Sequence, residues 1–142
     1  MNIVEFLNGL KKHTVIEDAS EEELERLADG VMKIELKEIK KIPYRGVKEL
    51  VEYKYDELTA MCPMTGIQNL YSVRLKYVPD NYIPELKSLR FYFLEYKDVP
   101  ISHEHLASRI YKDFIKVIKP ESIKLVLEVA VRGGIKTVIV IE

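Results

Sequence analysis

The stretch LYSVRLKYVPD, residues 70–80, alternates apolar and polar side chains. This period is typical of a β-strand with one buried face and one exposed face. The apolar face carries Tyr71, Val73, Leu75 and Tyr77, and the other face carries Ser72, Arg74 and Lys76. The stretch therefore predicts an antiparallel sheet that packs one face on a core.

Upstream of this strand, the chain predicts helices and then further strands. Apolar residues at helical spacing predict a helix over 2–12: Ile3, Phe6, Leu7 and Leu10. Ser20 and Glu23 form a capping box that begins a second helix, and Gly30 is its expected stop. Alternation then predicts a strand over 31–41 and another over 47–58, with a turn at 43–46 between them.

Downstream of the strand, the chain predicts two helices followed by two strands. One helix is expected from about Pro84, and a second over 102–119 is capped by Ser102 and closed by Pro120. The second helix is expected to turn four apolar residues inward: Leu106, Ile110, Phe114 and Val117. The two strands are expected over 122–131 and 135–142, and the Arg-Gly-Gly turn at 132–134 joins them.

The order of these elements predicts an α+β fold, with a four-stranded antiparallel sheet and two helices on one of its faces. Within one compact domain, residues 1–45 form a helical extension with the first strand, and residues 31–142 form the main unit. The other sheet face and the sheet edges have no partner within such a unit. The final strand, TVIVIE, is nearly continuous in apolar residues, so we expect subunits to associate edge to edge.

The composition narrows the class of protein. The chain has 142 residues, 47% of them hydrophobic, which is enough for one domain with its own core. Its 22 basic and 23 acidic residues leave a net charge of -1, so charge alone does not call for nucleic acid or a membrane. Neither a signal peptide nor an apolar run of about 20 residues is found. The single cysteine excludes an internal disulfide, and we expect a soluble, cytoplasmic protein.

The single cysteine, Cys62, lies in the turn-forming stretch AMCPMTGIQN, residues 60–69. A lone cysteine is most often a small buried hydrophobe. Cys62, however, precedes Pro63 and lies four residues before Gly66, at a junction where backbone amides can point outward. Such donors, or a nearby cation, lower the pKa of a thiol from about 8.5 and make it a nucleophile.

Charged residues elsewhere indicate two kinds of binding. His103 and Glu104 open the second predicted helix, and a carboxylate there can accept two parallel N–H donors from a guanine-like base. Lys87 and Arg90 share one helix face, and Arg132 precedes two glycines that allow a ligand to approach the backbone. These three cations together predict a phosphate site, although each alone is typical of a protein surface.

Four motifs that contain these residues occur in one order: CPMTG, ELKSLRFYF, HE and RGGI. The set closely resembles the QueF family, the 7-cyano-7-deazaguanine (nitrile) reductases of queuosine biosynthesis. The resemblance covers about residues 50–136 and leaves the first 45 residues outside it. Arg90 stands where the family usually has a second lysine.

The resemblance implies a fold and an activity. The fold is the tunnelling fold, whose subunits assemble into barrels, and it implies a ring-shaped homo-oligomer with active sites between subunits. The activity is the NADPH-dependent reduction of the nitrile of 7-cyano-7-deazaguanine to an aminomethyl group, through a thioimide on Cys62. NADPH is the implied cofactor, and the family needs no metal.

The resemblance also implies the roles of individual residues. Catalysis falls to Cys62, His103 and the residue at position 69, and substrate binding to Glu104 and Thr65. The implied cofactor contacts are Glu85, Lys87, Ser88, Arg90, Arg132 and Gly133.

Position 69 departs from the family pattern. Seven residues after its cysteine the family carries an aspartate that handles a proton during thioimide formation, and this chain carries Asn69. An amide orients a group by hydrogen bonding but cannot donate a proton as a carboxylic acid does. The proton must then come from elsewhere, and the candidates are His103, Asp56, Glu57 or water.

Two other functions stay open at this point. Archaeal relatives of the family are amidinotransferases that use the same thioimide, with ammonia, to make archaeosine in tRNA, which would make tRNA a partner. The intact ELKS and RGGI motifs favour the reductase, because an enzyme without NADPH has no need of phosphate contacts. A non-catalytic, purine-binding tunnelling-fold protein is the third hypothesis, and Asn69 is the residue that supports it.

Overall fold

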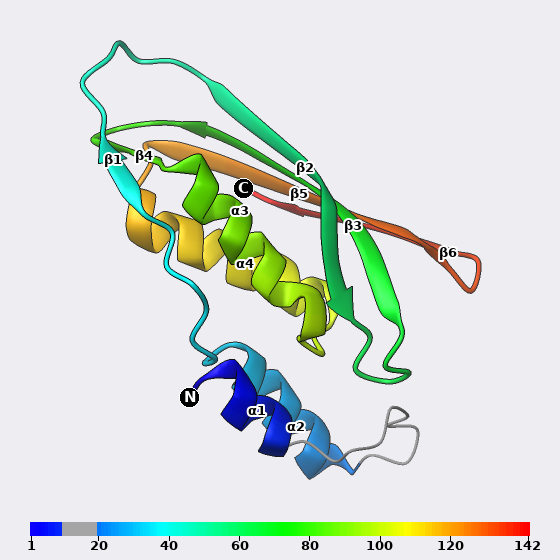
Figure 1. Ribbon diagram of the computed structural model, residues 1–142. Helices are drawn as coiled ribbons and strands as arrows, with labels where there is room; N and C mark the ends of the chain where they lie inside the picture. Colours follow the sequence, from blue (N-terminus) through cyan, green and yellow to red (C-terminus); the bar gives the residue numbers. More distant parts are fainter. Residues whose placement is uncertain (10–19) are drawn as a thin grey trace.

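The computed structural model of the 142-residue chain describes residues 1–9 and 20–142. Within these residues the main sheet has four antiparallel strands, in the order β2-β3-β5-β6 (Figure 1). The strands are Val51–Met61 (β2), Gln68–Val78 (β3), Ser122–Arg132 (β5) and Ile135–Ile141 (β6). The α+β class and the antiparallel sheet predicted from the sequence are confirmed.

Strand β3 lies inside the sheet, paired with β2 on one side and with β5 on the other. Its apolar face is buried as the alternation predicts. The exposed fraction is 3% or less for each of its four residues: Tyr71, Val73, Leu75 and Tyr77. Because the side-chain period of a strand is two residues, this burial also determines which residues of β2 and β5 face the core. The fold is therefore built around the stretch with the clearest alternation.

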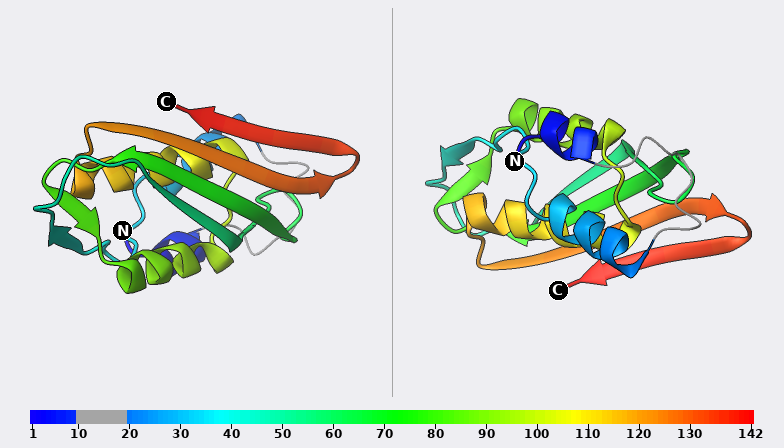
Figure 2. Two further views of the ribbon diagram at one scale, coloured as in Figure 1. Left: turned by 90° about the horizontal axis from the view of Figure 1, so that it is seen from above. Right: turned by 90° about the horizontal axis from the view of Figure 1, so that it is seen from below.

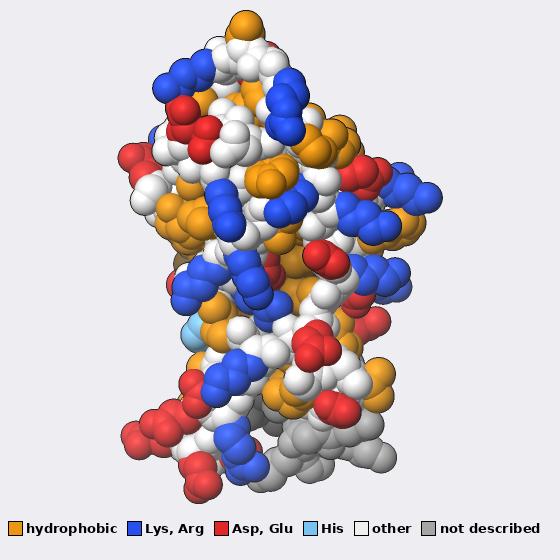
Figure 3. Space-filling model, turned by 90° about the vertical axis from the view of Figure 1, so that its left-hand side faces the viewer, with side chains coloured by type: hydrophobic (Ala, Val, Ile, Leu, Met, Phe, Trp, Pro, Cys, Tyr) orange, Lys and Arg blue, Asp and Glu red, His pale blue; other side chains and the backbone are white. Residues whose placement is uncertain are grey.

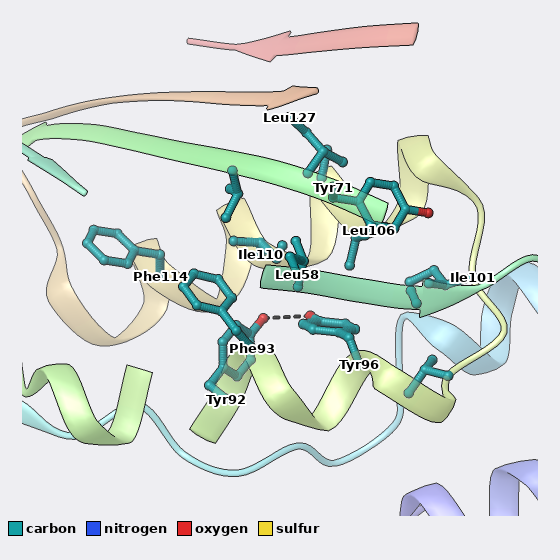
Figure 4. Packing of buried hydrophobic residues seen from close by; sticks show 14 of the residues in the cluster. Leu58, Tyr71, Tyr92, Phe93, Tyr96, Ile101, Leu106, Ile110, Phe114 and Leu127 are labelled. Carbon is teal, nitrogen blue, oxygen red and sulfur yellow. Dashed lines mark hydrogen bonds between the residues drawn. The ribbon is translucent and has the colours of Figure 1, made fainter. Parts of the chain in front are cut away.

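Two α-helices and a short 3-10 helix cover this buried face (Figures 1 and 2): Leu86–Leu94 (α3), Glu95–Asp98 (η1) and His103–Ile118 (α4). Helix α4 begins as predicted, since the Ser102 hydroxyl accepts a hydrogen bond from the His105 N–H. It ends at Lys119, whose φ of 48° is left-handed, and Pro120 follows. Figure 4 shows the core between helices and sheet, with Leu106, Ile110 and Phe114 pointing into it as predicted.

The strand predicted over residues 31–41 is wrong. Val31 is the last residue of helix α2 (Glu21–Val31), Met32 and Lys33 form a turn, and residues 34–40 belong to no strand and make a single bridge, between Asn2 and Glu35. The apolar residues of this segment are buried all the same, since Ile34 and Ile39 are 1% and 3% exposed. The segment shows a strand-like alternation because one side of it packs on the core. Side chains, rather than a neighbouring strand, make some of its backbone hydrogen bonds.

Several boundaries differ from the predictions. Lys41–Pro43 forms a short strand, β1, that pairs with Tyr82–Pro84, β4, so Pro43 and Pro84 lie in strands rather than in a turn and a helix start. Gly30 does not stop helix α2, because the helix continues through it to Val31. The glycine instead makes room for the Phe6 ring, which a side chain at position 30 would overlap.

The N-terminal helices belong to the same core. Helix α1 spans Ile3–Gly9, and the predicted residues 10–12, including Leu10, lie outside the described residues. The Ser20 hydroxyl caps α2 by accepting a hydrogen bond from the Glu23 N–H at 3.2 Å, as predicted. Phe6, Leu27 and Val31 belong to the same buried cluster as the side chains of the sheet and helices.

Arg109 of α4 links the N-terminal segment to the main unit. Its guanidinium donates hydrogen bonds to the backbone oxygens of Val31 and Ile34, at 3.0 and 2.7 Å, and to the Asp113 carboxylate at 2.8 Å. The same carboxylate oxygen accepts a hydrogen bond from the Tyr92 hydroxyl at 2.6 Å. A guanidinium carries five N–H donors in a fixed planar arrangement, so it can hold these three acceptors at once.

We expect Arg109→Ala to destabilise the protein by about 3 kcal/mol, because it leaves two backbone oxygens and the Asp113 carboxylate without their partner. Lys112→Ala, on the exposed side of the same helix, is the control and should change stability little. Urea denaturation at one protein concentration measures both variants. Equal midpoints for the two variants would show that the Arg109 network does not hold the segment in place.

Candidate active site

The turn between β2 and β3 holds Cys62 in a fixed position. The Cys62 N–H donates to the Ile67 oxygen at 2.8 Å, and the Gly66 N–H donates to the Cys62 oxygen at 2.8 Å. Gly66 has a φ of 71°, which a residue with a side chain rarely adopts, so the turn requires its glycine. Cys62 is half-buried and follows directly on the last residue of β2.

The surroundings of Cys62 favour the thiolate. Partial burial raises the pKa of the thiol, but hydrogen bonds from the Thr65 hydroxyl and from the backbone N–H groups of Thr65 and Met64 lower it. The positive charge of Arg132 lowers it further, and the net pKa lies below the ordinary value of 9.0. A thiol in such a setting is a nucleophile rather than an inert core residue.

Backbone pairing brings the start of α4 to this turn. The Met61 N–H donates to the Val99 oxygen at 3.0 Å, and the Ile101 N–H donates to the Met61 oxygen at 3.1 Å. Ser102 and His103 follow directly, so the first turn of α4 lies beside the residue after Met61, which is Cys62. His103 and Cys62, separated by about 40 residues in the sequence, therefore lie at the same end of the sheet.

Tyr71 is the member of the site that the sequence did not identify. Its hydroxyl lies 2.8 Å from Nδ1 of His103, and the two rings meet edge to face with their centroids 5.5 Å apart. Figure 4 shows this hydroxyl at the edge of the core, directed toward the start of α4. The alternation of β3 predicts only that Tyr71 lies in the core, and the residue is 3% exposed. The signal that could have identified it is its position two residues after Asn69, on the same face of β3.

The pKa of Tyr71 shows which groups surround it. Burial raises this pKa most, a hydrogen bond from the Asn69 amide lowers it, and the charges of Cys62 and Glu104 raise it. The charge of Arg132 lowers it, and the resulting pKa is about 12. The charges of Cys62, Glu104 and Arg132 all affect the pKa of this one hydroxyl, so these groups lie in a single cluster.

Asn69 is 5% exposed and lies opposite Ala60 in the β2–β3 register. The two carboxylates considered as alternative acids lie elsewhere. Asp56 accepts a hydrogen bond from the Ser72 hydroxyl at 2.5 Å, and both Asp56 and Glu57 are exposed. They precede Cys62 by six and five residues, which places them about 17–20 Å back along the strand. Of the side chains proposed as proton sources, the structure brings only His103 to the site.

Arg132 lies with Cys62 rather than with the other predicted cofactor contacts. A register shift between Val129 and Arg132 precedes the turn, and Gly133 and Gly134 have φ values of 56° and 80°. The Arg132 guanidinium donates a hydrogen bond to the backbone oxygen of Gln68. Among residues 1–9 and 20–142, none apart from the two chain neighbours of Gly133 lies within 4 Å of where a side chain at this position would begin, so the turn is open for a ligand to approach.

The predicted cofactor residues of α3 form a second group. The Glu85 carboxylate caps the helix by accepting a hydrogen bond from the Ser88 N–H at 2.6 Å, and the Ser88 hydroxyl donates to the backbone oxygen of Glu85 at 2.7 Å. Both side chains are therefore engaged within the chain. Lys87 and Arg90 are exposed. The N-terminal end of α3 lies at the opposite end of the sheet from the Cys62 turn (Figures 1 and 2).

The surface around the start of α3 is basic. Lys87 and Lys37 extend over the ring of Phe91, with their Nζ atoms 5.9 and 5.1 Å from its centroid, and Lys41 lies 4.1 Å from the centroid of Tyr82. Figure 3, which faces the side of β1, β4 and the start of α3, shows lysine and arginine side chains gathered across its middle. Cations next to exposed aromatic rings suit a ligand that carries both phosphates and flat rings.

Two further observations concern the described residues alone. Across 1–9 and 20–142, no three or more histidine, cysteine, aspartate or glutamate side chains are grouped so that they could hold a metal ion. In the same part of the chain, no helix has the length and apolarity that crossing a membrane requires.

Comparison with known proteins identifies similar chains. A family model described as "QueF-like protein" matches residues 70–142. An NADPH-dependent 7-cyano-7-deazaguanine reductase of Chloroherpeton thalassium is 35% identical over 108 residues, which are 76% of this chain and 93% of that protein. The enzyme of the same name from Caldicellulosiruptor bescii is 34% identical over 113 residues, covering 78% of this chain and 86% of that protein.

A solved structure shares the fold. It is described as the archaeosine synthase QueF-Like in the apo form, and it superimposes with a TM-score of 0.63. The match covers 68% of this chain and 94% of that chain at 19% identity. At this identity the likeness concerns the fold alone.

We expect Thr65→Val to raise the pKa of Cys62, because the thiolate loses a hydrogen bond from a hydroxyl. At pH 7 the variant should react with iodoacetamide several-fold more slowly. The pH dependence of alkylation, followed by mass spectrometry, reports on this one thiol because the chain has a single cysteine. Thr137→Val on β6 is the control, and an inflection at the same pH in both variants would contradict the role of the Thr65 hydroxyl.

Proposed function

The chain belongs to the QueF family, and we propose that it reduces 7-cyano-7-deazaguanine with NADPH to 7-aminomethyl-7-deazaguanine, for the modification of tRNA with queuosine. The observation that carries the proposal is the cluster around Cys62, a thiol with a lowered pKa beside His103, Glu104 and Arg132. Relatives that are 34–35% identical over most of their length bear the name of this reductase.

Cys62 is the proposed nucleophile. Its sulfur attacks the nitrile carbon and forms a thioimide, which divides a difficult reduction into smaller steps. The Thr65 hydroxyl and the turn N–H groups that lower the thiol pKa hold the sulfur anion until it reacts. Arg132 adds positive charge at the same place, and this charge favours the thiolate over the thiol.

Glu104 is the proposed partner of the deazaguanine ring. It is exposed in the first turn of α4, next to His103, so its carboxylate is free to accept two N–H groups of the base. Two parallel hydrogen bonds to one carboxylate fix the orientation of a flat ring as well as its position. A ring held in this way would direct its nitrile group toward one side of the site, where Cys62 lies.

Lys87 and Arg90 are the proposed contacts of NADPH, which supplies the hydrides. Their exposed cations suit phosphate groups. Glu85 and Ser88 bond to each other and hold the start of α3, so we give them the part of positioning Lys87. Gly133, in its open turn, lets the ligand approach the backbone beside Arg132.

We further propose that two subunits complete each site, in a ring-shaped homo-oligomer of the tunnelling-fold type. Within one chain α3 begins at the far end of the sheet from Cys62, so α3 of a neighbour must supply the cofactor contacts. Strands β2 and β6 are the edge strands of this sheet in the part of the chain that the structure describes. Val138 and Val140 of β6 are about half exposed, at 49% and 51%, which supports a contact along this edge.

The proposal extends to the N-terminal residues and to the place of action. Residues 1–45 form an extension to the catalytic unit of residues 31–142, and we propose that it seals a contact between subunits. Its helices already bury Phe6 and Leu27 in the common core. A free catalytic thiol requires a reducing compartment, so we place the protein in the cytoplasm.

The native protein mixed with 7-cyano-7-deazaguanine should oxidise two NADPH for each nitrile that is reduced, and Cys62→Ala should oxidise none. NADPH absorbance, together with mass spectrometry of the product, measures both. A native protein that forms the adduct but transfers ammonia instead of hydride would be an amidinotransferase acting on tRNA. A native protein that binds the nitrile without any adduct would be a binding protein.

The shared site can be tested by complementation. Cys62→Ala and the double variant Lys87→Ala/Arg90→Ala should each be inactive, the latter through loss of NADPH binding. When the two chains are co-expressed with different tags and purified on both tags, about a quarter of the native activity should return, because a quarter of the sites join two intact halves.

The control for this experiment is Cys62→Ala co-expressed with the triple variant Cys62→Ala/Lys87→Ala/Arg90→Ala, in which no site has a cysteine. This pair should stay inactive. If the first pair also stays inactive while purifying as a mixed oligomer, each chain builds its site alone and the shared site is refuted.

A further inference from the structure

We propose that Tyr71 and His103 together replace the carboxylic acid that position 69 lacks, with Tyr71 positioning the imidazole. The inference rests on the proposed function, because it concerns proton delivery to the nitrile nitrogen during thioimide formation. Its basis is the 2.8 Å contact between the Tyr71 hydroxyl and Nδ1 of His103, two residues along β3 from Asn69, where the chain departs from the family pattern.

The Tyr71 hydroxyl lies 2.8 Å from Nδ1 of His103. We assign the hydroxyl as the donor of this hydrogen bond and Nδ1 as its acceptor. Burial keeps this hydroxyl protonated at neutral pH, since its pKa is about 12. A neutral imidazole that accepts at Nδ1 carries its own proton on Nε2. His103 is thereby held as an N–H donor at Nε2.

The strand register places this set next to the nucleophile. Asn69 lies opposite Ala60 and Tyr71 opposite Leu58, and these four side chains share the buried face of the sheet. Cys62 comes two residues after Ala60, so it continues the same face beyond the end of β2. The electrostatic effect of Cys62 on Tyr71 agrees with this placement.

The proton count of the step closes without a carboxylic acid. The thiol releases its proton to solvent, and the sulfur then forms the C–S bond while one C–N π bond breaks and its electron pair moves to nitrogen. That nitrogen takes the proton from Nε2 of His103, and Nδ1 takes the proton of the Tyr71 hydroxyl. The Tyr71 oxygen, next to the Asn69 amide and within the field of Arg132, regains a proton from solvent.

Tyr77 provides a matched control for Tyr71. It lies on the same strand and the same buried face, is 0% exposed, and has its hydroxyl 3.0 Å from that of Tyr53. It follows Tyr71 by six residues, which places it about 20 Å farther from the Cys62 turn. Removing either hydroxyl costs one buried hydrogen-bonding group, but only one of the two contacts His103.

The experiment measures the rate of thioimide formation without NADPH, by intact-protein mass spectrometry after mixing with 7-cyano-7-deazaguanine. Tyr71→Phe should slow adduct formation about 100-fold, and Tyr77→Phe should leave it near the native rate. Equilibrium binding of the nitrile, compared between Cys62→Ala and Cys62→Ala/Tyr71→Phe, should be unchanged. A loss of rate without a loss of binding separates proton delivery from a damaged pocket.

Rescue provides the second test. Asn69→Asp restores an acid at the family position, so Asn69→Asp/Tyr71→Phe should form the adduct about as fast as Asn69→Asp alone. The inference is overturned if Tyr71→Phe forms the adduct at the native rate. It is also overturned if Tyr71→Phe slows adduct formation as much in the Asn69→Asp background as in the native protein. Either result leaves the proposed reductase activity standing. A native protein that binds the nitrile but never forms the adduct overturns both, so the two failures can be told apart.

Discussion

The pairing of Met61 with the segment before α4 is the interaction on which the site depends. Its N–H donates to Val99 and its oxygen accepts from Ile101, at 3.0 and 3.1 Å, and both partners are 0% exposed. Cys62 follows one end of this pairing and His103 the other, so two backbone hydrogen bonds set the distance between sulfur and imidazole. Buried backbone groups are costly to leave unpaired. The relative position of the two side chains is therefore as rigid as the sheet.

Burial explains why position 69 can hold an amide. An ionised aspartate that is 95% buried loses its hydration, which costs several kcal/mol unless cations or donors surround it. An asparagine avoids this cost because it carries no charge, and the neighbouring Tyr71 hydroxyl has His103 as its partner. The amide makes the interior more stable, but it removes the acid that the chemistry requires. Under the proposed function, a proton donor must then come from the neighbouring side chains, and the one that the fold places there is His103.

The sequence predicted what depends on local pattern and missed what depends on distant partners. The alternation of β3, the Ser102 cap and the Cys62 turn are local, and the structure contains all three. The strand predicted over 31–41 failed because Arg109, 75 residues from Ile34, takes that residue's backbone oxygen. Tyr71 was concealed within an apolar pattern, since a buried tyrosine looks like any other core residue until the position of His103 is known. Arg132 was grouped with the α3 cations because sequence order carries no information on which end of a sheet a turn occupies.

The separation of Cys62 from α3 has a consequence for any reaction that needs both. Reacting atoms must approach to about 3–3.5 Å before a hydride can transfer. Strand β2 has 11 residues and spans about 36 Å, and the two groups lie toward opposite ends of the sheet. The charge of Arg132 lowers the pKa of both Cys62 and Tyr71, and so favours the thiolate. Lys87 and Arg90 are not among the groups that shift either pKa. A single chain thus contains a complete site for the nucleophile and an incomplete one for the hydride donor, and a second copy with its α3 against the Cys62 turn would supply what is missing.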